Sequence, residues 1–300
     1  MTENDKQHSC DILILVAVRS EFEQLEKAAR AFNTEFVKKF HKILGTYYSM
    51  GKVGDYCVNA KYTREMGPLG YRGSASMAIN FKMAMNASKI IQLGMCFGIS
   101  TDKQKQGDLI ISTYIVPYDR RKVFAIGTTA PVRATTDDDR DENKDTILPI
   151  AAQLSQSSPN QVPSQPVDYR VDYSDVKSYP CNQDLLKMFE DEKARGGYNH
   201  AVYLGGLLSG GAQIRSRKFV QELIESIQVS DDEEIKGGDM EGVGLLSVSP
   251  QDDPIWIVVK GISDFADENY DRDIQGRELA CLNSANFVLN AISKCKAIRN

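Results

Sequence analysis

With 300 residues, of which 42% are hydrophobic, the chain is long enough to bury a sizeable core within one large domain. Its formal net charge of −5 provides no overall attraction to nucleic acid or to an anionic membrane, so we expect neither as a partner. The sequence has no run of about 18 apolar residues and no apolar signal segment, so we expect a cytoplasmic protein.

Cysteine and histidine are used sparsely. The six cysteines have no CxxC spacing, which argues against a zinc site or a disulfide framework and indicates reduced, mostly buried thiols. The three histidines form neither an HExxH motif nor a cluster. We therefore expect no metal and no organic cofactor, and any catalysis must depend on carboxylates.

The chain begins with a buried strand predicted at residues 11–18, followed by a helix that starts near Ser20. Glu21 would lie at the amino end of this helix, above the carboxyl edge of the strand. It either has a functional role or simply complements the helix dipole. A glycine-rich loop at 66–73 then precedes a helix of small residues at 74–87. Such a loop can receive an anion or can merely permit a tight turn.

Further strands are predicted at 89–99 and 109–112. The alternation of strands and helices predicts an α/β fold, a single three-layer domain over residues 1–300 with a central mixed β-sheet flanked by helices. A polar, charged and proline-containing stretch at about 127–180 is expected to be a partly flexible insertion rather than a domain boundary.

Regular structure is expected again from an amphipathic segment near 182–193 and a strand at 201–204. A glycine-dense loop follows and ends at Gln213 and Ile214, where a flat ligand could approach backbone amides closely. The final helix, at about 277–294, carries apolar residues at helical spacing and is predicted to be structural.

Two acidic stretches organise the remaining sequence. Glu241 lies between glycines just before an apolar run, where a loop is expected to become a helix. The apolar run 255–259 leads to Asp264, as when a buried parallel strand delivers a carboxylate at its carboxyl edge. Two carboxylates facing one crevice are typical of a sugar-cleaving site. Taken singly, each acid could instead be a cap.

The order of these segments resembles the nucleoside phosphorylase-I superfamily, and within it the 5′-methylthioadenosine/S-adenosylhomocysteine nucleosidase branch. The resemblance is carried by residues 16–21, 106–112, 239–241 and 262–264, and it covers the chain apart from an insertion at about 127–200. It implies a nucleoside phosphorylase-like fold and a homo-oligomer whose neighbours complete the site. The implied activity is hydrolysis of the N-glycosidic bond of an adenine nucleoside or nucleotide.

The resemblance also implies catalytic roles. Asp264 matches the acid that protonates the purine, and Ser263 matches its helper. Glu241 would hydrogen-bond the ribose hydroxyls, with Met240 against the sugar, and Glu21 would activate water. The chemistry agrees, because a purine leaves readily only if an acid kept neutral by burial protonates it. An oxocarbenium-like sugar is stabilised by carboxylates beside it.

Recognition of the base is expected from Gln213 and Ile214, which match positions where the family lays backbone groups along the purine. A phenylalanine is common in the family where Gln213 stands. Phe265 or Phe97 could therefore supply the stacking surface instead.

Water is the expected nucleophile. Phosphorylases of this superfamily carry a Gly-Asp-Pro-x-Arg type of loop, whereas this chain has Val-Ala-Val-Arg-Ser-Glu, and Met95 beside Gly94 replaces the family's hydroxyl residue. No charge-assisted phosphate cradle is evident. A phosphate-dependent phosphorylase remains an alternative if Arg19 or Arg72 builds an unfamiliar anion site. A non-catalytic purine-binding module is the other alternative, although it would not need a water-activating acid.

The substrate is predicted to be a small purine nucleoside or nucleotide. Arg72, Arg120 and Arg215 lie near the predicted loops and could reach a 5′-phosphate, which would make AMP or ATP an alternative to a 5′-thio nucleoside. They could equally be solvated surface arginines.

Overall fold

The computed structural model describes residues 10–125, 169–227, 234–267 and 273–296. Its centre is a mixed sheet of ten strands in the order β11-β10-β6-β12-β5-β1-β4-β3-β2, with β9 paired to β6. The strands of this sheet are β1 (Ile12–Val16), β2 (Val37–His41), β3 (Gly45–Val53), β4 (Tyr56–Tyr62), β5 (Lys89–Gly98), β6 (Leu109–Pro117), β9 (Tyr179–Pro180), β10 (Val202–Ser209), β11 (Ile235–Asp239) and β12 (Trp256–Asp264).

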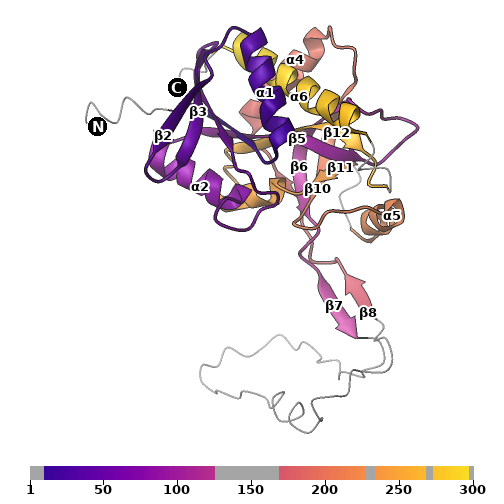
Figure 1. Cartoon of the computed structure of the whole chain (residues 1–300). Coiled ribbons are helices and arrows are strands. Elements are labelled where there is room, and N and C mark those ends of the chain that lie inside the picture. Colours follow the sequence, from indigo (N-terminus) through magenta and orange to yellow (C-terminus); the bar gives the residue numbers. More distant parts are fainter. Residues whose placement is uncertain (1–9, 126–168, 228–233, 268–272, 297–300) are drawn as a thin grey trace, which may run out of the picture. The chain divides into compact units, whose positions relative to one another are not determined.

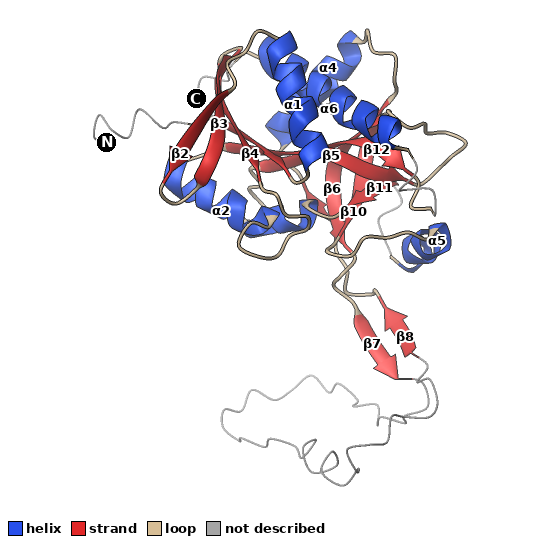
Figure 2. Ribbon diagram, viewed as in Figure 1, coloured by secondary structure: helices blue, strands red, loops and turns tan. Residues whose placement is uncertain are grey.

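Helices cover both faces of the sheet. Helices α1, α4 and α6 lie together on one face, and α2 lies on the other beside the short 3-10 helix η2 (Figure 2). The bounds are α1 (Arg19–Ala31), α2 (Ser74–Met85), α4 (Gln183–Arg195), α5 (Arg217–Ser226), η2 (Gly242–Ser247) and α6 (Ile274–Lys294). The predicted α/β fold with a central mixed sheet is thereby confirmed.

The middle of the sheet is parallel and buried. Strand β5 pairs in parallel with β1 and with β12, so the carboxyl ends of these strands meet at one edge (Figure 1). Every residue of β1 is buried, as expected for an apolar run covered on both sides. Helix α6 packs on β5 and β12, and the structural role predicted for the final helix is confirmed.

Strand β11 reaches the same edge from another direction. It runs parallel to β10 and also pairs antiparallel with β5, with Gly237 opposite Gly98 and Gly238 opposite Phe97. A Cβ atom at Gly237 would lie 2.4 Å from the Phe97 carbonyl oxygen, and one at Gly238 would lie 2.3 Å from the Phe97 ring. Only glycine permits this approach, which delivers the following acidic residues to the edge of β5.

Residues 122–172 form a separate compact unit. Its described part is a hairpin of β7 (Lys122–Ala125) and β8 (Tyr169–Asp172), in register from Lys122 opposite Asp172 to Ala125 opposite Tyr169. Most of the expected insertion, at 126–168, lies outside the described residues. Residues 173–180 belong to the larger unit, and β9 pairs with β6, so the main fold resumes before position 180.

None of the helices that the structure describes is both long enough and apolar enough to cross a membrane.

Candidate active site

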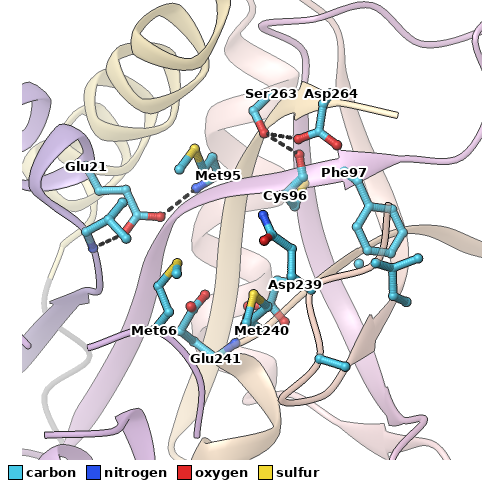
Figure 3. A pocket seen from close by; sticks show the side chains of 15 residues that line it. Glu21, Met66, Met95, Cys96, Phe97, Asp239, Met240, Glu241, Ser263 and Asp264 are labelled. Carbon is cyan, nitrogen blue, oxygen red and sulfur yellow. Dashed lines mark hydrogen bonds between the residues drawn. The ribbon is translucent and has the colours of Figure 1, made fainter. Parts of the chain in front are cut away.

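A pocket opens where β5, β11 and β12 end (Figure 3). Its volume is about 70 Å³, below the roughly 300–1,000 Å³ of typical small-molecule pockets. Two of its lining side chains, Met66 and Gln213, are exposed at the surface. The sequence-predicted residues that line it are Glu21, Met95, Phe97, Gln213, Ile214, Met240, Glu241, Ser263 and Asp264.

Glu21 lies in the first turn of α1 and is 4% exposed. Its Oε2 accepts the backbone N–H groups of Ala17 at 2.7 Å and Val18 at 3.1 Å, and its Oε1 accepts that of Met95 at 3.0 Å. Gly94 has a φ of +149°, and a Cβ atom there would lie 1.9 Å from Glu21 Oε1. Two backbone segments therefore fix this carboxylate, and glycine at position 94 makes room for it. Gly94 thus supports Glu21 and is not among the residues that line the pocket.

Glu241 precedes η2 directly, as the sequence predicted, and is 6% exposed. Its Oε1 accepts the backbone N–H of Gly67 at 3.3 Å, and its carbonyl oxygen accepts the hydroxyl of Ser74 at 2.6 Å. The glycine-rich loop before α2 therefore receives an anion, but the anion is this side chain.

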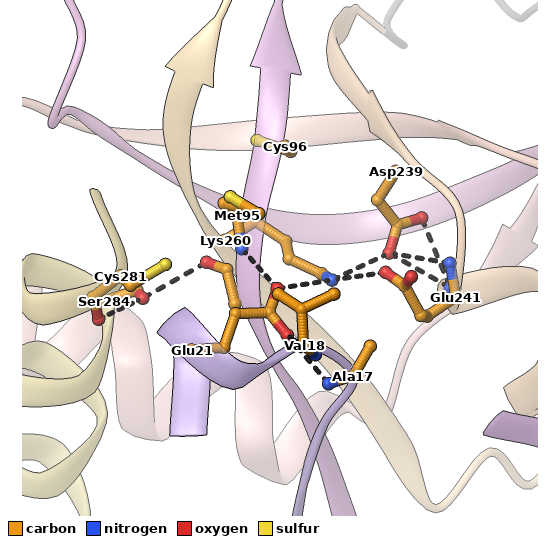
Figure 4. Close-up of polar contacts among 12 residues, drawn as sticks. Ala17, Val18, Glu21, Met95, Cys96, Asp239, Glu241, Lys260, Cys281 and Ser284 are labelled. Atoms are coloured by element: carbon orange, nitrogen blue, oxygen red, sulfur yellow. Dashed lines mark hydrogen bonds and ion pairs between the residues drawn. The ribbon is translucent and has the colours of Figure 1, made fainter. Parts of the chain in front are cut away.

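Lys260 lies among the acids and is completely buried (Figure 4). Its Nζ is 2.8 Å from Glu241 Oε2, 3.3 Å from Asp239 Oδ2 and 4.0 Å from Glu21 Oε1. Burial acts to lower the pKa of Lys260, but these carboxylates together raise the pKa above its ordinary value. Burial raises the pKa of Glu241, Lys260 opposes this rise, and the neighbouring acids add to it. The ammonium thus holds the acids in one cluster.

Asp239 is a cap as well as a partner of Lys260. Its Oδ1 accepts the hydroxyl of Ser209 at 2.6 Å, and its Oδ2 accepts the backbone N–H groups of Gly242 at 3.0 Å and Glu241 at 3.4 Å. The capping alternative therefore applies to Asp239, while its neighbour Glu241 faces the pocket.

Asp264 ends β12 and lies across the pocket from Glu21 and Glu241 (Figure 3). Its Oδ1 accepts the backbone N–H of Ala266 at 2.9 Å, and its Oδ2 lies 2.7 Å from Ser263 Oγ, which is also 3.1 Å from the Cys96 carbonyl oxygen. A hydroxyl has one proton and cannot donate to both acceptors. If Asp264 is protonated, it donates to Ser263, which then donates to Cys96, and both contacts are hydrogen bonds; if Asp264 is ionised, Ser263 donates to only one of the two acceptors.

The pKa of Asp264 agrees with this arrangement. Burial raises the pKa of the carboxyl group, and the hydrogen bonds that its ionised form accepts from Ser263 and Ala266 only partly oppose the rise. The side chain can therefore keep a proton at a higher pH than an exposed aspartic acid does.

The two candidate stacking residues lie differently. Phe97 lines the pocket on the side of Asp264 (Figure 3), whereas Phe265 is not among its lining residues. The guanidinium of Arg217 lies 5.8 Å from the Phe265 ring centroid and is ion-paired with Asp267 at 2.8 Å. Phe97 is thus the aromatic ring available to a ligand in this pocket.

The arginines expected near a 5′-phosphate do not line the pocket in the described part of the chain. Arg72 lines a different cavity. Arg120 donates to the Tyr179 hydroxyl and lies over that ring at 5.3 Å. Arg215 is exposed and donates to Gln213 Oε1 at 3.3 Å, so it reaches the rim only through a lining residue.

Sequence reasoning missed Lys260 and the partnership of Asp239 with it. A signal was present, because Lys260 interrupts an otherwise apolar strand run, and a buried lysine requires acidic partners. Cys96 and Met66 also line the pocket and were not predicted.

Comparisons with known proteins agree with the fold. The chain is similar to the 5′-methylthioadenosine/S-adenosylhomocysteine nucleosidase of Neisseria meningitidis in complex with methylthio-immucillin-A, with 18% identity and a TM-score of 0.62 over 95% of this chain and 100% of that one. It is also similar to the S-adenosylhomocysteine nucleosidase of Streptococcus pyogenes in complex with 5-methylthiotubericidin, with 16% identity and a TM-score of 0.62 over 96% of this chain and 98% of that one. A third similar structure is the futalosine hydrolase of Helicobacter pylori, with 16% identity and a TM-score of 0.61 over 96% of this chain and 98% of that one.

No curated protein matches the sequence. At sequence identities of 16–18%, similarity to these structures establishes only the fold. The family is established separately, by a family model that matches the amino-acid sequence. The model of the family described as "Phosphorylase superfamily" matches residues 11–293. The chain therefore belongs to the phosphorylase superfamily, as the resemblance of its motifs predicted.

Proposed function

We propose that the chain is a purine N-ribosyl hydrolase that cleaves the N-glycosidic bond of an adenine nucleoside to free base and a ribosyl product. One observation carries the proposal: Glu21, Glu241 and Asp264, far apart in the sequence, line one pocket. The similar solved structures are named as nucleosidases and a futalosine hydrolase, which favours the same reaction class.

Asp264 is the proposed general acid. The purine must gain a proton as the bond to C1′ breaks, since its anion is a poor leaving group. The hydroxyl of Ser263, shared between Asp264 and the Cys96 carbonyl, supports a protonated carboxyl group at this position. Phe97 is the proposed stacking surface for the base, with the backbone at Gln213 and Ile214 along its edge.

Glu21 is the proposed base that holds the attacking water. A carboxylate offers about four acceptor positions, and three are taken by backbone N–H groups, which leaves one on Oε1. Lys260 Nζ lies 4.0 Å from that oxygen, so a single water can contact both groups. The water would therefore be oriented before the sugar arrives.

Glu241 is the proposed partner of the ribose hydroxyls, with Met240 packed against the sugar. Gly67 and Lys260 occupy one acceptor position on each of its oxygens, so about two of four remain for the sugar. Its negative charge stabilises the oxocarbenium-like transition state.

Two alternatives make different predictions. A phosphorylase needs a cationic phosphate site at the sugar, but no arginine lines the described part of this pocket, and Lys260 is already paired with acids. A non-catalytic binding module has no use for a carboxylate with an acceptor position free for water. We therefore favour hydrolysis.

Adenine release from 5′-methylthioadenosine tests the proposal, measured by chromatography with and without added phosphate. We expect release without phosphate and a free ribosyl product. Dependence on phosphate with a 1-phosphate product would identify a phosphorylase, and adenine binding without turnover would identify a binding module. Adenosine, AMP and ATP assayed in parallel define the substrate.

The variant Asp264→Asn is expected to lower kcat by about 10²- to 10⁴-fold, the usual contribution of general acid catalysis. Its matched control, Asp252→Asn, changes an exposed aspartate in a loop and should leave kcat unchanged. Equal rates for Asp264→Asn and the wild type would remove Asp264 from the mechanism.

We also propose a homo-oligomer in a cytoplasmic setting. Phe40, Leu69 and Met83 carry large apolar side chains that are 74%, 79% and 81% exposed, and a contact between copies of the chain would remove such apolar surface from water. All six cysteines are unpaired, which agrees with a reducing compartment. Light scattering after size-exclusion chromatography should give a mass above that of one chain.

A further inference from the structure

A second cavity, of about 280 Å³, lies beside β3, β4 and the loop before α2. It shares no lining residue with the proposed active site. Three cationic side chains line it, Lys61, Arg64 and Arg72, and no acidic residue is among its described lining residues. In a chain with a net charge of −5, this concentration of positive charge needs a physical reason.

Lys61 is the buried member of the set, at 8% exposed. Its Nζ donates to the carbonyl oxygens of Leu44 at 2.7 Å and Thr46 at 2.8 Å. An ammonium has three N–H donors, and the third has no partner among the described residues. Buried lysines normally have an acidic partner. Burial, followed by Arg72 and Arg64, lowers the pKa of Lys61 to about 8.

The two arginines lack acidic partners as well. Within the described part of the chain, no carboxylate lies within 4.0 Å of either guanidinium group. Arg64 lies over the Tyr62 ring at 5.4 Å, and its backbone has a φ of +63°. Arg72 contacts Glu65 only through its backbone N–H, at 3.2 Å. Among the described residues, no ion pair therefore compensates the mutual repulsion of these cations.

We propose that this cavity is a binding site for the phosphate group of a small phosphorylated molecule. Arginine presents a planar fork that matches phosphate oxygens, and a desolvated ammonium adds a short charge-assisted bond. Tyr48 and Tyr71 also line the cavity, and Tyr71, which is 75% exposed, offers a hydroxyl group and a flat apolar surface for the rest of the ligand. The volume, close to the lower limit of about 300 Å³ for small-molecule pockets, fits a phosphorylated sugar.

The site is joined to the proposed active site by one loop. Residues 63–73 place Arg64 and Arg72 at the cavity, Met66 at the other pocket and Gly67 on Glu241. An anion that fixes this loop also fixes two contacts of the proposed active site. The phosphate itself is not the nucleophile, because the two cavities have separate walls.

Calorimetric titration at low ionic strength tests the site directly, with inorganic phosphate, ribose 5-phosphate and AMP as separate probes. We expect saturable binding to the wild type. The double variant Arg64→Ala/Arg72→Ala should bind at least about tenfold more weakly, because each charge-assisted bond lost costs that order of affinity. If inorganic phosphate binds, the phosphate group is sufficient for recognition. If only ribose 5-phosphate and AMP bind, the sugar also contributes to the affinity.

The matched control is Lys27→Ala/Arg30→Ala, which removes the same charge from an exposed face of α1 and should bind as the wild type does. Lys61→Met should abolish binding, but it also removes two hydrogen bonds to the backbone and can therefore disturb the fold. The double variant Arg64→Ala/Arg72→Ala, which changes exposed side chains, is therefore the decisive test. Absent binding to the wild type, equal affinities for the two double variants, or AMP binding that adenine displaces would each overturn the proposal. The titrations with inorganic phosphate and ribose 5-phosphate involve no turnover, so the hydrolase proposal is tested separately.

Discussion

Ser263 has one proton for two acceptors, so both of its contacts can be hydrogen bonds only when Asp264 is protonated. The same reasoning applies to Lys260, whose charge is needed because three carboxylates surround it. At the scale of single residues, the proposed site thus depends on where protons lie between Asp264 and Ser263 and on the charge balance around Lys260. Two predictions belong to this scale.

The first prediction concerns pH. Because burial raises the pKa of Asp264, the acid keeps its proton to a higher pH than an exposed aspartate, and it loses the proton as pH rises further. We expect kcat/KM for adenine release to fall as pH rises through that pKa. This fall in kcat/KM at high pH should be absent from the residual activity of Asp264→Asn and present in Asp252→Asn. If Asp264→Asn shows the same fall, the titrating group is not Asp264.

The second prediction concerns Lys260→Met, which leaves buried acids without their counter-charge. Removing one member of a buried ion pair costs about 3–5 kcal/mol, and we expect a loss of that order in the free energy of unfolding. Without Lys260, the raised pKa of Glu241 would rise further.

A raised pKa in the folded state contributes stability below the unfolded pKa, about 4.3 for glutamate, and that stability is lost as pH increases. The deficit in Tm should therefore be smallest near that pH and grow toward neutrality. Lys260→Arg keeps the charge and should lose less. Lys218→Met, at an 86% exposed side chain, is the control and should melt as the wild type does. A deficit that is independent of pH would point to packing instead of charge.

At the scale of elements, the proposed site depends on close approaches that glycine permits. Strand β5 passes Glu21 at Gly94, and β11 passes β5 at Gly237 and Gly238. Each approach brings an acid-bearing segment to the carboxyl edge of β5. The local backbone of these elements therefore positions the carboxylates together with the buried side chain of Lys260.

The third prediction follows from Gly94. An alanine there would place its Cβ atom 1.9 Å from Glu21 Oε1, so the carboxylate must move away from Met95. A shift of about 1 Å in a catalytic group can cost 10²-fold in rate, and we expect Gly94→Ala to lower kcat by about that factor. The control is Gly196→Ala, which also has a positive φ, of +68°, but has open space around its Cβ. Similar kinetics for both variants would show that Glu21 tolerates displacement.

How much the sequence could predict also depends on the element. Buried strands such as β1 and β12, which are long apolar runs, were predictable, and so were the acids at their ends. The antiparallel pairing of β11 with β5 was not, because it joins segments about 140 positions apart through glycines that carry no hydrophobic pattern. Whether Arg72, Arg120 and Arg215 line the pocket could not be predicted either, because long side chains on loops follow no periodic pattern in the sequence.

At the scale of the whole molecule, the chain consists of a large unit and a small one at residues 122–172. The large unit contains every residue proposed for catalysis. Because Lys122 and Asp172 are paired in register, their Cα atoms are about 5 Å apart, as in any antiparallel pair. A short turn can therefore replace everything between them.

The fourth prediction uses that geometry. Replacing residues 123–171 with a two-residue Asn-Gly turn, a sequence that favours tight hairpins, should preserve the fold. We expect an unchanged Tm and unchanged adenine release, measured beside the full chain. Loss of folding would show that the small unit supports the large one, and loss of turnover alone would give the unit a role in catalysis. Phosphate titration of the same variant examines the second cavity independently.

The buried lysine has one further consequence, which concerns synthesis. Lys260 is in the last strand, and its acidic partners come from the first helix and from residues just before η2. A growing polypeptide that has not yet emerged from the ribosome beyond position 260 contains the acids without their cation. The nascent chain therefore cannot assemble the cluster, and a translation product truncated before this strand should be inert.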